Sequence, residues 1–353
     1  MSPLARLALV WLIPAILGCL AQPASAEAPL FASDAPLAMV IEGPIVALDR
    51  AGPRSTIARP ATLVLHADGA EQSFAIAISP RGVSRRDPRV CDFPPLTLDF
   101  DEGAVAGTIF EGQDKLKLVT HCRREARFAH LPRLEYLAYR FYELLTPLSF
   151  KVRPVAITYR EAGRDAAGGE RFGFLIEDID DVARRNGRRE ISAGSAEIPV
   201  ERFDPQQTSL LALFQYMIGN LDWDYRYGPV GADCCHNIKL IARAGQSAGI
   251  VPVPYDFDFS GFVDAPYAVP PSQVRVQSVR TRFFRGRCRH RDELLAAAAP
   301  FRTHRAAMLA LLDSAPDMNA AARLRARSYL DEFFALLDDP ARFDAELVRR
   351  CIR

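Results

Sequence analysis

Two short stretches of this sequence concentrate acidic residues beside strand-forming residues. GNLDWDYRYGPVGADCCHNIKLI covers residues 219–241, PYDFDFSG covers residues 254–261, and together they contain one lysine. Acidic side chains crowded against apolar strands are costly unless a positive charge lies among them. Carboxylate and amide oxygens suit Mg²⁺ or Mn²⁺, so the pattern predicts a divalent-cation site. The residues available for it are Asp222, Asp224, Asn237, Asp256 and Asp258.

The first stretch follows a well-marked helix. Asp204 is its predicted N-cap, Pro205 its first residue, and Gln207 completes a capping box. An apolar stripe follows, and Gly219 ends the helix. Asp222 is therefore expected in a loop that a buried helix holds in place.

The second stretch ends a predicted hairpin. NIKLIA and GIVPVPY flank the turn RAGQSAG, which sets Asn237 roughly opposite Asp256. Asp258 lies two residues further on and shares a strand face with Asp256. These polar side chains are thus expected to converge near Asp222.

The rest of the chain predicts a mixed architecture. Residues 37–121 alternate or cluster strand formers, which indicates a mostly antiparallel sheet. LPRLEYLAYRFYELL has helical periodicity with Pro132 near its start, two strands follow it, and residues from about 292 onward are rich in helix formers.

The order of helix, Asp-bearing loop, Asn-led strand and strand ending in Asp-x-Asp resembles the catalytic half of protein-kinase-like folds. The resemblance is nearest to the CotH spore-coat kinases and more distant to the HipA kinases. It implies an α+β, two-lobed protein-kinase-like fold, with a β-rich N-terminal lobe at 27–180 that contains one inserted helix. A helix-rich C-terminal lobe at 181–353 would carry the catalytic hairpin.

The resemblance also implies roles for individual residues. Asp222 would orient or deprotonate an acceptor hydroxyl, while Asn237 and Asp256, with Asp258 beside them, would hold Mg²⁺ or Mn²⁺ on the phosphates of ATP. Asp224 and His236 are expected to have ordinary loop and capping roles.

Upstream, SPRGVSRR resembles the CotH segment near the nucleotide phosphates, where the backbone of Gly82 and the guanidinium of Arg85 or Arg86 would cradle phosphate. An arginine-rich surface turn is the alternative. The chain lacks the lysines that usually follow this segment, so Lys117 or Lys115 is the candidate phosphate-binding lysine.

Two acidic residues and one basic segment complete the expected site. Glu177 resembles the acidic residue that contacts adenine, with a solvated strand end as the alternative. Glu135 could pair with the lysine or lie on a solvated helix face. The arginines of residues 278–293 could attract an anionic substrate or form a solvated loop.

The N-terminus predicts export. Residues 1–26 read as a signal peptide, with an apolar run and a small-residue cleavage site near Ala26. A membrane anchor and a lipoprotein attached at Cys19 are the alternatives. We expect a periplasmic or secreted mature chain without a membrane span, and the balance of 44 Lys+Arg against 43 Asp+Glu does not favour nucleic-acid binding.

Six cysteines remain after removal of the signal, an even set that favours disulfides over a zinc site. Antiparallel strands after Cys91 and before Cys122 predict a bridge between these two. The adjacent Cys234 and Cys235 are expected to point apart and find different partners.

The function expected from these residues is transfer of phosphate from ATP to an unknown protein or small-molecule acceptor. An exported pseudokinase or nucleotide-binding interaction module is one alternative, and nucleotidyl or amino-acid transfer is another. A calcium-stabilised structural protein would use the same carboxylates without a nucleotide.

Overall fold

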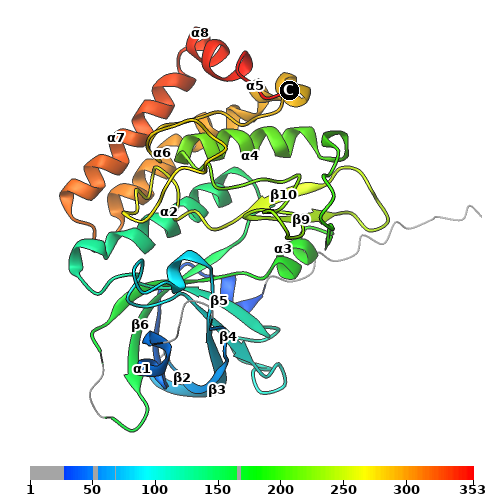
Figure 1. The fold of residues 1–353 in the computed structure, drawn as a ribbon. Coiled ribbons are helices and arrows are strands. Elements are labelled where there is room, and N and C mark those ends of the chain that lie inside the picture. The colour runs from blue at the N-terminus through cyan, green and yellow to red at the C-terminus, as the bar shows by residue number, and fades with distance from the viewer. Residues whose placement is uncertain (1–27, 51–54, 68, 165–167) are drawn as a thin grey trace, which may run out of the picture.

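The computed structural model describes residues 28–50, 55–67, 69–164 and 168–353, and it confirms the α+β class. Figure 1 shows strands β1–β6 in the lower part of the molecule, and most helices, with β9 and β10 among them, above. Seven strands form a closed barrel in the order β1-β2-β3-β4-β5-β7-β6. Their bounds are β1 Leu37–Gly43, β2 Arg59–Ala67, β3 Ala70–Pro80, β4 Leu96–Phe100, β5 Lys115–Val119, β6 Val152–Glu161 and β7 Arg171–Ile176.

Barrel closure is the main difference from the predicted antiparallel sheet. The seam is a parallel pairing of β1 with β6, in which Leu37 lies opposite Val155, while the other neighbouring strands pair antiparallel. One face of the strands forms an apolar core that includes Leu63, Ile78 and Leu98, all fully buried. Closure removes the exposed edges that an open sheet would present.

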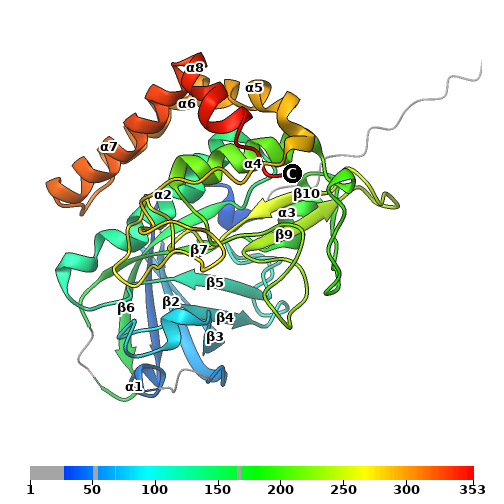
Figure 2. The same cartoon turned by 45° about the horizontal axis from the view of Figure 1, so that its top comes forward.

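Most of the helices share a second apolar core, and Figure 2 shows their arrangement from another side. The long helices are α2 (His130–Leu145), α4 (Pro205–Ile218), α6 (Ala299–Ser314) and α7 (Ala320–Leu337). The short ones are α1 (Ile45–Asp49), α3 (Ile179–Arg185), α5 (Leu294–Ala297) and α8 (Pro340–Phe343). Phe174 and Ile176 of β7 join this core, so the barrel packs directly on the helices. The proposed domain boundary at residue 180 falls in the first turn of α3.

Helix α4 begins and ends as its sequence predicts. The Asp204 carboxylate accepts a hydrogen bond from the backbone N–H of Gln207 at 2.9 Å. Gly219 ends the helix with φ of 63°, and a Cβ there would lie 1.9 Å from the Tyr329 hydroxyl oxygen. Only glycine therefore fits the turn that leads into the Asp222 loop.

A three-stranded sheet carries the predicted hairpin. Its order is β10 (Val251–Pro254), β9 (Ile238–Ala242), β8 (Arg189–Glu190), with β9 and β10 antiparallel. The backbone N–H of Tyr255 donates to the carbonyl of Asn237 at 3.1 Å. Asn237 therefore faces Tyr255, one residue from the predicted partner Asp256.

The described residues contain three disulfides. The predicted Cys91–Cys122 bridge is confirmed, with its Cα atoms 4.6 Å apart. A second disulfide joins Cys288 to Cys351, and the third joins Cys234 to Cys235. The prediction that the adjacent cysteines find different partners is wrong, because the other four described cysteines are already paired.

Every helix in the described part of the chain is too short or too polar to cross a bilayer. The predicted signal segment, residues 1–26, lies outside the described residues.

Candidate functional site

Most of the predicted site residues line one pocket of about 620 Å³. The pocket is formed by the loop after β3, by β4 and β5, by the loop after α4, and by the residues around the β9–β10 hairpin. It brings together Gly82, Arg85, Lys117, Asp222, Asn237, Asp256 and Asp258. Its volume is within the range of small-molecule sites.

The Asp222 carboxylate is held on both oxygens. Oδ1 accepts a hydrogen bond from Nε2 of His236 at 2.8 Å, and Oδ2 accepts from Nδ2 of Asn237 at 3.0 Å. The backbone N–H of Asp222 donates to the side chain of buried Asn220 at 3.0 Å. Asp222 is thus fixed in one orientation at the pocket wall.

His236 belongs to the site although its sequence context predicted an ordinary loop residue. It lines the pocket, and its hydrogen bond to Asp222 raises the pKa of its imidazole. Asp224 has the predicted structural role, because its carboxylate accepts from Arg285 at 2.9 Å and from the backbone N–H of Arg226 at 2.8 Å.

The backbone turns sharply where the first strand of the hairpin begins and where the second strand ends. Asn237 has φ of 52° and Asp256 has φ of 63°, a left-handed region that side chains other than glycine, Asn and Asp rarely adopt. The hydroxyl of Tyr139 on α2 accepts a hydrogen bond from the backbone N–H of Asp256 at 2.9 Å. Such conformations cost about 1–3 kcal/mol each and concentrate at functional sites.

An arginine lies among the acidic side chains. The Arg85 guanidinium contacts Asp258 at 3.2 Å, Glu135 at 3.2 Å and Asp256 at 3.6 Å. The Glu135, Asp256 and Asp258 carboxylates lie within 4.8 Å of one another. Arg85 therefore supplies at least part of the positive charge that the sequence attributed to a metal ion.

Burial governs the protonation of this cluster. Glu135 and Asp258 are almost fully buried, and loss of water raises the pKa of both carboxyls. The positive charge of Arg85 opposes that rise. The structure also corrects the expectation for Glu135, which lies inside the protein and pairs with Arg85 instead of a lysine.

The donor set at the pocket surface fits Mg²⁺ or Mn²⁺. The Asp256 side chain is 34% exposed, and its nearest cation, Arg85, is at the long distance of 3.6 Å. Asn237 uses Nδ2 to hold Asp222, which leaves its amide oxygen as a ligand atom. Asp258 engages Arg85 and Tyr267 through Oδ2, so its other oxygen remains. These hard oxygen donors are the kind that both cations prefer.

Lys117 is the lysine that reaches the pocket. Its ammonium lies 5.2 Å from the centre of the Tyr255 ring, and burial lowers its pKa to about 8. Lys115, on the same strand, is exposed and lies 4.0 Å from Asp99 outside the pocket. Arg86 also lies outside it and donates to the carbonyl of Ser55 at 3.4 Å.

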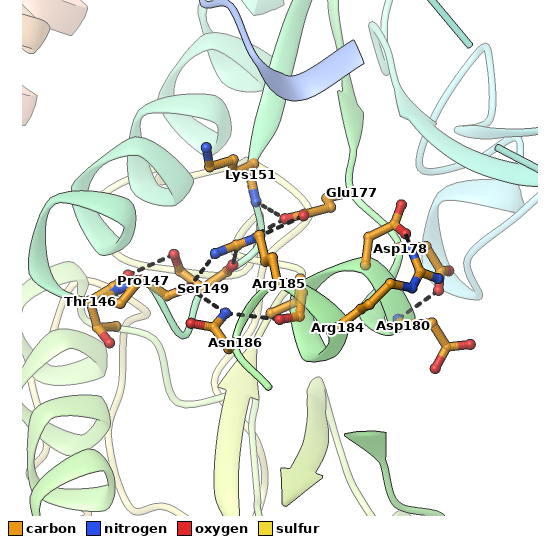
Figure 3. A network of polar contacts seen from close by, with 12 residues as sticks. Thr146, Pro147, Ser149, Lys151, Glu177, Asp178, Asp180, Arg184, Arg185 and Asn186 are labelled. Carbon is orange, nitrogen blue, oxygen red and sulfur yellow. Dashed lines mark hydrogen bonds and ion pairs between the residues drawn. The ribbon is translucent and has the colours of Figure 1, made fainter. Parts of the chain in front are cut away.

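Glu177 has a structural environment, shown in Figure 3. Its carboxylate is 1% exposed, and it accepts hydrogen bonds from Arg185 at 2.9 and 3.0 Å and from the backbone N–H of Lys151 at 2.9 Å. Arg185 also donates to the carbonyls of Pro147 and Ser149. This network ties α3 to the segment after α2, and it leaves Glu177 outside the pocket.

The arginine-rich segment at 278–293 turns two of its guanidinium groups inward. Arg282 donates to the backbone carbonyls of Met217 and Tyr329, and Arg285 donates to the carbonyl of Leu221 and to Asp224. These two arginines brace the loop after α4, so they are not available to attract a substrate.

Comparison with known proteins adds a distant structural likeness. No protein-family model matches the chain, and no curated protein matches its sequence. The chain resembles the crystal structure of a Helicobacter pylori proinflammatory kinase, CtkA, with a TM-score of 0.37 and 9% identity. The likeness covers 72% of this chain and 91% of that chain. So distant a likeness does not support any particular function. A functional proposal for this chain therefore depends on the geometry of the pocket.

Proposed function

We propose that this protein is a phosphotransferase that uses ATP with Mg²⁺ or Mn²⁺ and has a two-lobed, kinase-like arrangement. The observation that carries the proposal is the charge pattern of the pocket. Its lining contains the carboxylates of Asp222, Asp256 and Asp258 together with the cationic side chains of Lys117 and Arg81. Phosphoryl transfer needs positioned oxygen ligands, cations on the phosphates and a carboxylate near the nucleophile.

Each residue then has a distinct task. Asn237, Asp256 and Asp258 would hold the cation, which neutralises phosphate charge when it is bound. Lys117 would contact the phosphates, and the exposed backbone at Gly82, with φ of 78°, can approach them closely. Asp222 would orient the acceptor hydroxyl and take up its proton.

Export of the protein is part of this proposal. Three disulfides within the described residues are typical of a chain that folds in an oxidising compartment. With residues 1–26 as a signal peptide cleaved near Ala26, the mature chain would be periplasmic or secreted. The relationship to the CotH and HipA kinases is likewise a hypothesis, which rests on the sequence motifs.

A nucleotide-binding module without turnover is the second candidate. Arg85 already pairs with the acidic cluster, and both carboxylate oxygens of Asp222 already accept hydrogen bonds. Both features favour a pocket that binds without reacting. The same Arg85 contacts weaken the calcium-stabilised alternative, because the cluster has a protein cation.

Thermal unfolding tests whether the pocket binds nucleotide with metal. Mn²⁺ with ATP at a hundredfold excess over Kd should stabilise the wild type by about 2.7 kcal/mol, which raises the melting temperature by several degrees. Asp256→Asn removes a ligand charge and should abolish most of this shift. The exposed Asp180→Asn is the matched control and should retain it.

Two results would count against this account. Without a nucleotide-dependent shift in the wild type, the proposed nucleotide site would have to be abandoned. A shift with Ca²⁺ alone that ATP does not enlarge would support the structural calcium role instead.

The pH dependence of nucleotide binding tests the task of Lys117. Its lowered pKa of about 8 means that the ammonium is charged below pH 8 and loses its proton above it. The affinity for Mg²⁺ with ATP should therefore fall as pH rises, by about tenfold between pH 7 and pH 9. Lys117→Arg stays charged throughout and should show little dependence. Equal wild-type affinity at both pH values in binding titrations would refute a phosphate contact by Lys117.

A further inference from the structure

A second pocket, of about 490 Å³, is built from three segments that meet near the first one. They are the loop after β3, the segment that runs from the end of β5 into the first turn of α2, and the short stretch Pro266 to Tyr267. The Cys91–Cys122 disulfide joins the first two of these segments. Among the described residues, the two pockets share no lining residue.

The lining of this second pocket is strongly basic. Arg89, Arg123 and Arg127 contribute to it, whereas Glu125 is the one carboxylate among its described lining residues. Guanidinium groups match phosphate and carboxylate oxygens in a planar, bidentate geometry. The excess of arginine therefore favours an anionic ligand.

The three arginines differ in how far they are already engaged. Arg89 is bound to Asp87 at 2.6 Å, and Arg123 donates to Asp92 at 3.1 Å and to the carbonyl of Arg89 at 2.5 Å. Arg127 lies at the longer distance of 3.9 Å from Glu125 and is 75% exposed. Arg127 is thus the guanidinium best able to reorient toward a ligand, with Arg123 fixed beside it.

The remaining lining is apolar and partly aromatic. Phe128, Leu131, Val90 and Pro266 lie at the pocket, and the Arg127 guanidinium stands 4.6 Å from the centre of the Phe128 ring. Burial of an apolar group against these side chains would add to the electrostatic attraction. An anion that carries an apolar body would therefore bind better than a bare anion.

One lining residue also contacts Asp258, a proposed metal ligand. Tyr267 borders the second pocket, and its hydroxyl donates to Oδ2 of Asp258 at 3.1 Å. A ligand in the second pocket would thus touch a residue that holds Asp258 in place.

We propose that this second pocket binds a small organic anion, with a phosphate-like or carboxylate head on the arginines and an apolar body against Phe128 and Leu131. Nothing in this assignment depends on nucleotide binding at the first pocket. The proposals for the two pockets can therefore be tested independently of each other.

Calorimetric titration of the whole chain with phenyl phosphate tests the assignment. Inorganic phosphate supplies the charge alone and benzyl alcohol the apolar group alone, and both should bind at least tenfold more weakly than phenyl phosphate. Arg127→Glu should weaken phenyl phosphate binding at least tenfold. Because Arg127 is exposed, this variant should melt at the wild-type temperature, which the same samples can confirm.

Two variants serve as controls. Arg342→Glu reverses the charge of another exposed arginine, on α8, and Lys117→Met alters the first pocket; both should change the affinity less than twofold. The proposal is overturned if the wild type does not bind phenyl phosphate or if Arg342→Glu weakens binding as much as Arg127→Glu. It is also overturned if Lys117→Met abolishes binding and Arg127→Glu does not, since the probe would then occupy the first pocket.

Discussion

Asp222→Asn is expected to lower the Mn²⁺-dependent turnover of ATP by about a hundredfold or more, while the affinity for ATP changes little. The substitution keeps the shape of the side chain but removes the charge that would take up the acceptor proton, and general acid–base catalysis contributes roughly 10²–10⁴-fold to enzyme rates. The oxygens of Asn237 and Asp256 that are proposed to bind the metal remain. Released phosphate and autophosphorylation measure turnover, and a binding titration measures affinity.

The exposed Asp180→Asn on α3 is the control for this experiment, and its turnover should equal that of the wild type. An equal loss of binding and turnover in Asp222→Asn would assign Asp222 to the metal site instead of the acceptor. Wild-type turnover in Asp222→Asn would remove it from the mechanism.

Arg85→Met is expected to destabilise the fold by about 3–5 kcal/mol at pH 8, because it leaves buried carboxylates without their cation. Glu135 is 1% exposed and the Asp258 side chain 6% exposed, so water cannot replace the guanidinium. Denaturant unfolding at matched pH measures the free energy of unfolding. The exposed Arg342→Met, which breaks a surface pair with Glu346, should cost less than about 1 kcal/mol.

The loss in Arg85→Met should depend on pH in a definite direction. Burial raises the pKa of Glu135 and Asp258 above their unfolded values, and removal of Arg85 raises both further. The folded state then holds more protons than the unfolded state, so stability falls as pH rises through this window. The variant should be closer to wild type at pH 5.5 than at pH 8, and the double variant with Glu135→Gln should recover part of the loss. A pH-independent loss would contradict the role of Arg85 as counter-ion.

Local sequence signals predicted the parts of the site that one segment determines. The N-cap at Asp204 and the left-handed Gly219 fix the ends of α4, and both depend on residues a few positions apart. The hairpin pattern predicted that Asn237 lies opposite Asp256, which is one residue from its observed partner, Tyr255. Asp222 and Asn237 consequently meet as expected, since the elements that carry them are local.

Contacts between distant segments could not be read from such patterns. Arg85 belongs to a loop that resembled a phosphate cradle, and nothing near it in the sequence indicates that it ends among carboxylates from α2 and the hairpin. The same holds for barrel closure, because the pairing of β1 with β6 joins strands that carry no signal for each other. The burial of Glu135 follows from that assembly.

For Glu177 and His236, the local sequence was compatible with more than one environment. Glu177 directly follows strand β7, a position from which its carboxylate could contact a ligand or form an internal ion pair. In the structure it forms an ion pair with Arg185 of α3. His236 precedes Asn237 without a distinctive motif, and only the fold brings it within 2.8 Å of Asp222. A search for polar residues next to the predicted ligands would have found it.

The most direct test of the central proposal is incubation of the purified protein with Mn²⁺ and either γ-labelled or α-labelled ATP. We predict that label is transferred from the γ position alone and that Asp222→Asn and Asp256→Asn both abolish the transfer. Transfer of label from the α position would show nucleotidyl transfer. If the protein binds ATP but transfers label from neither position, phosphotransfer is contradicted and the nucleotide-binding module without turnover is favoured.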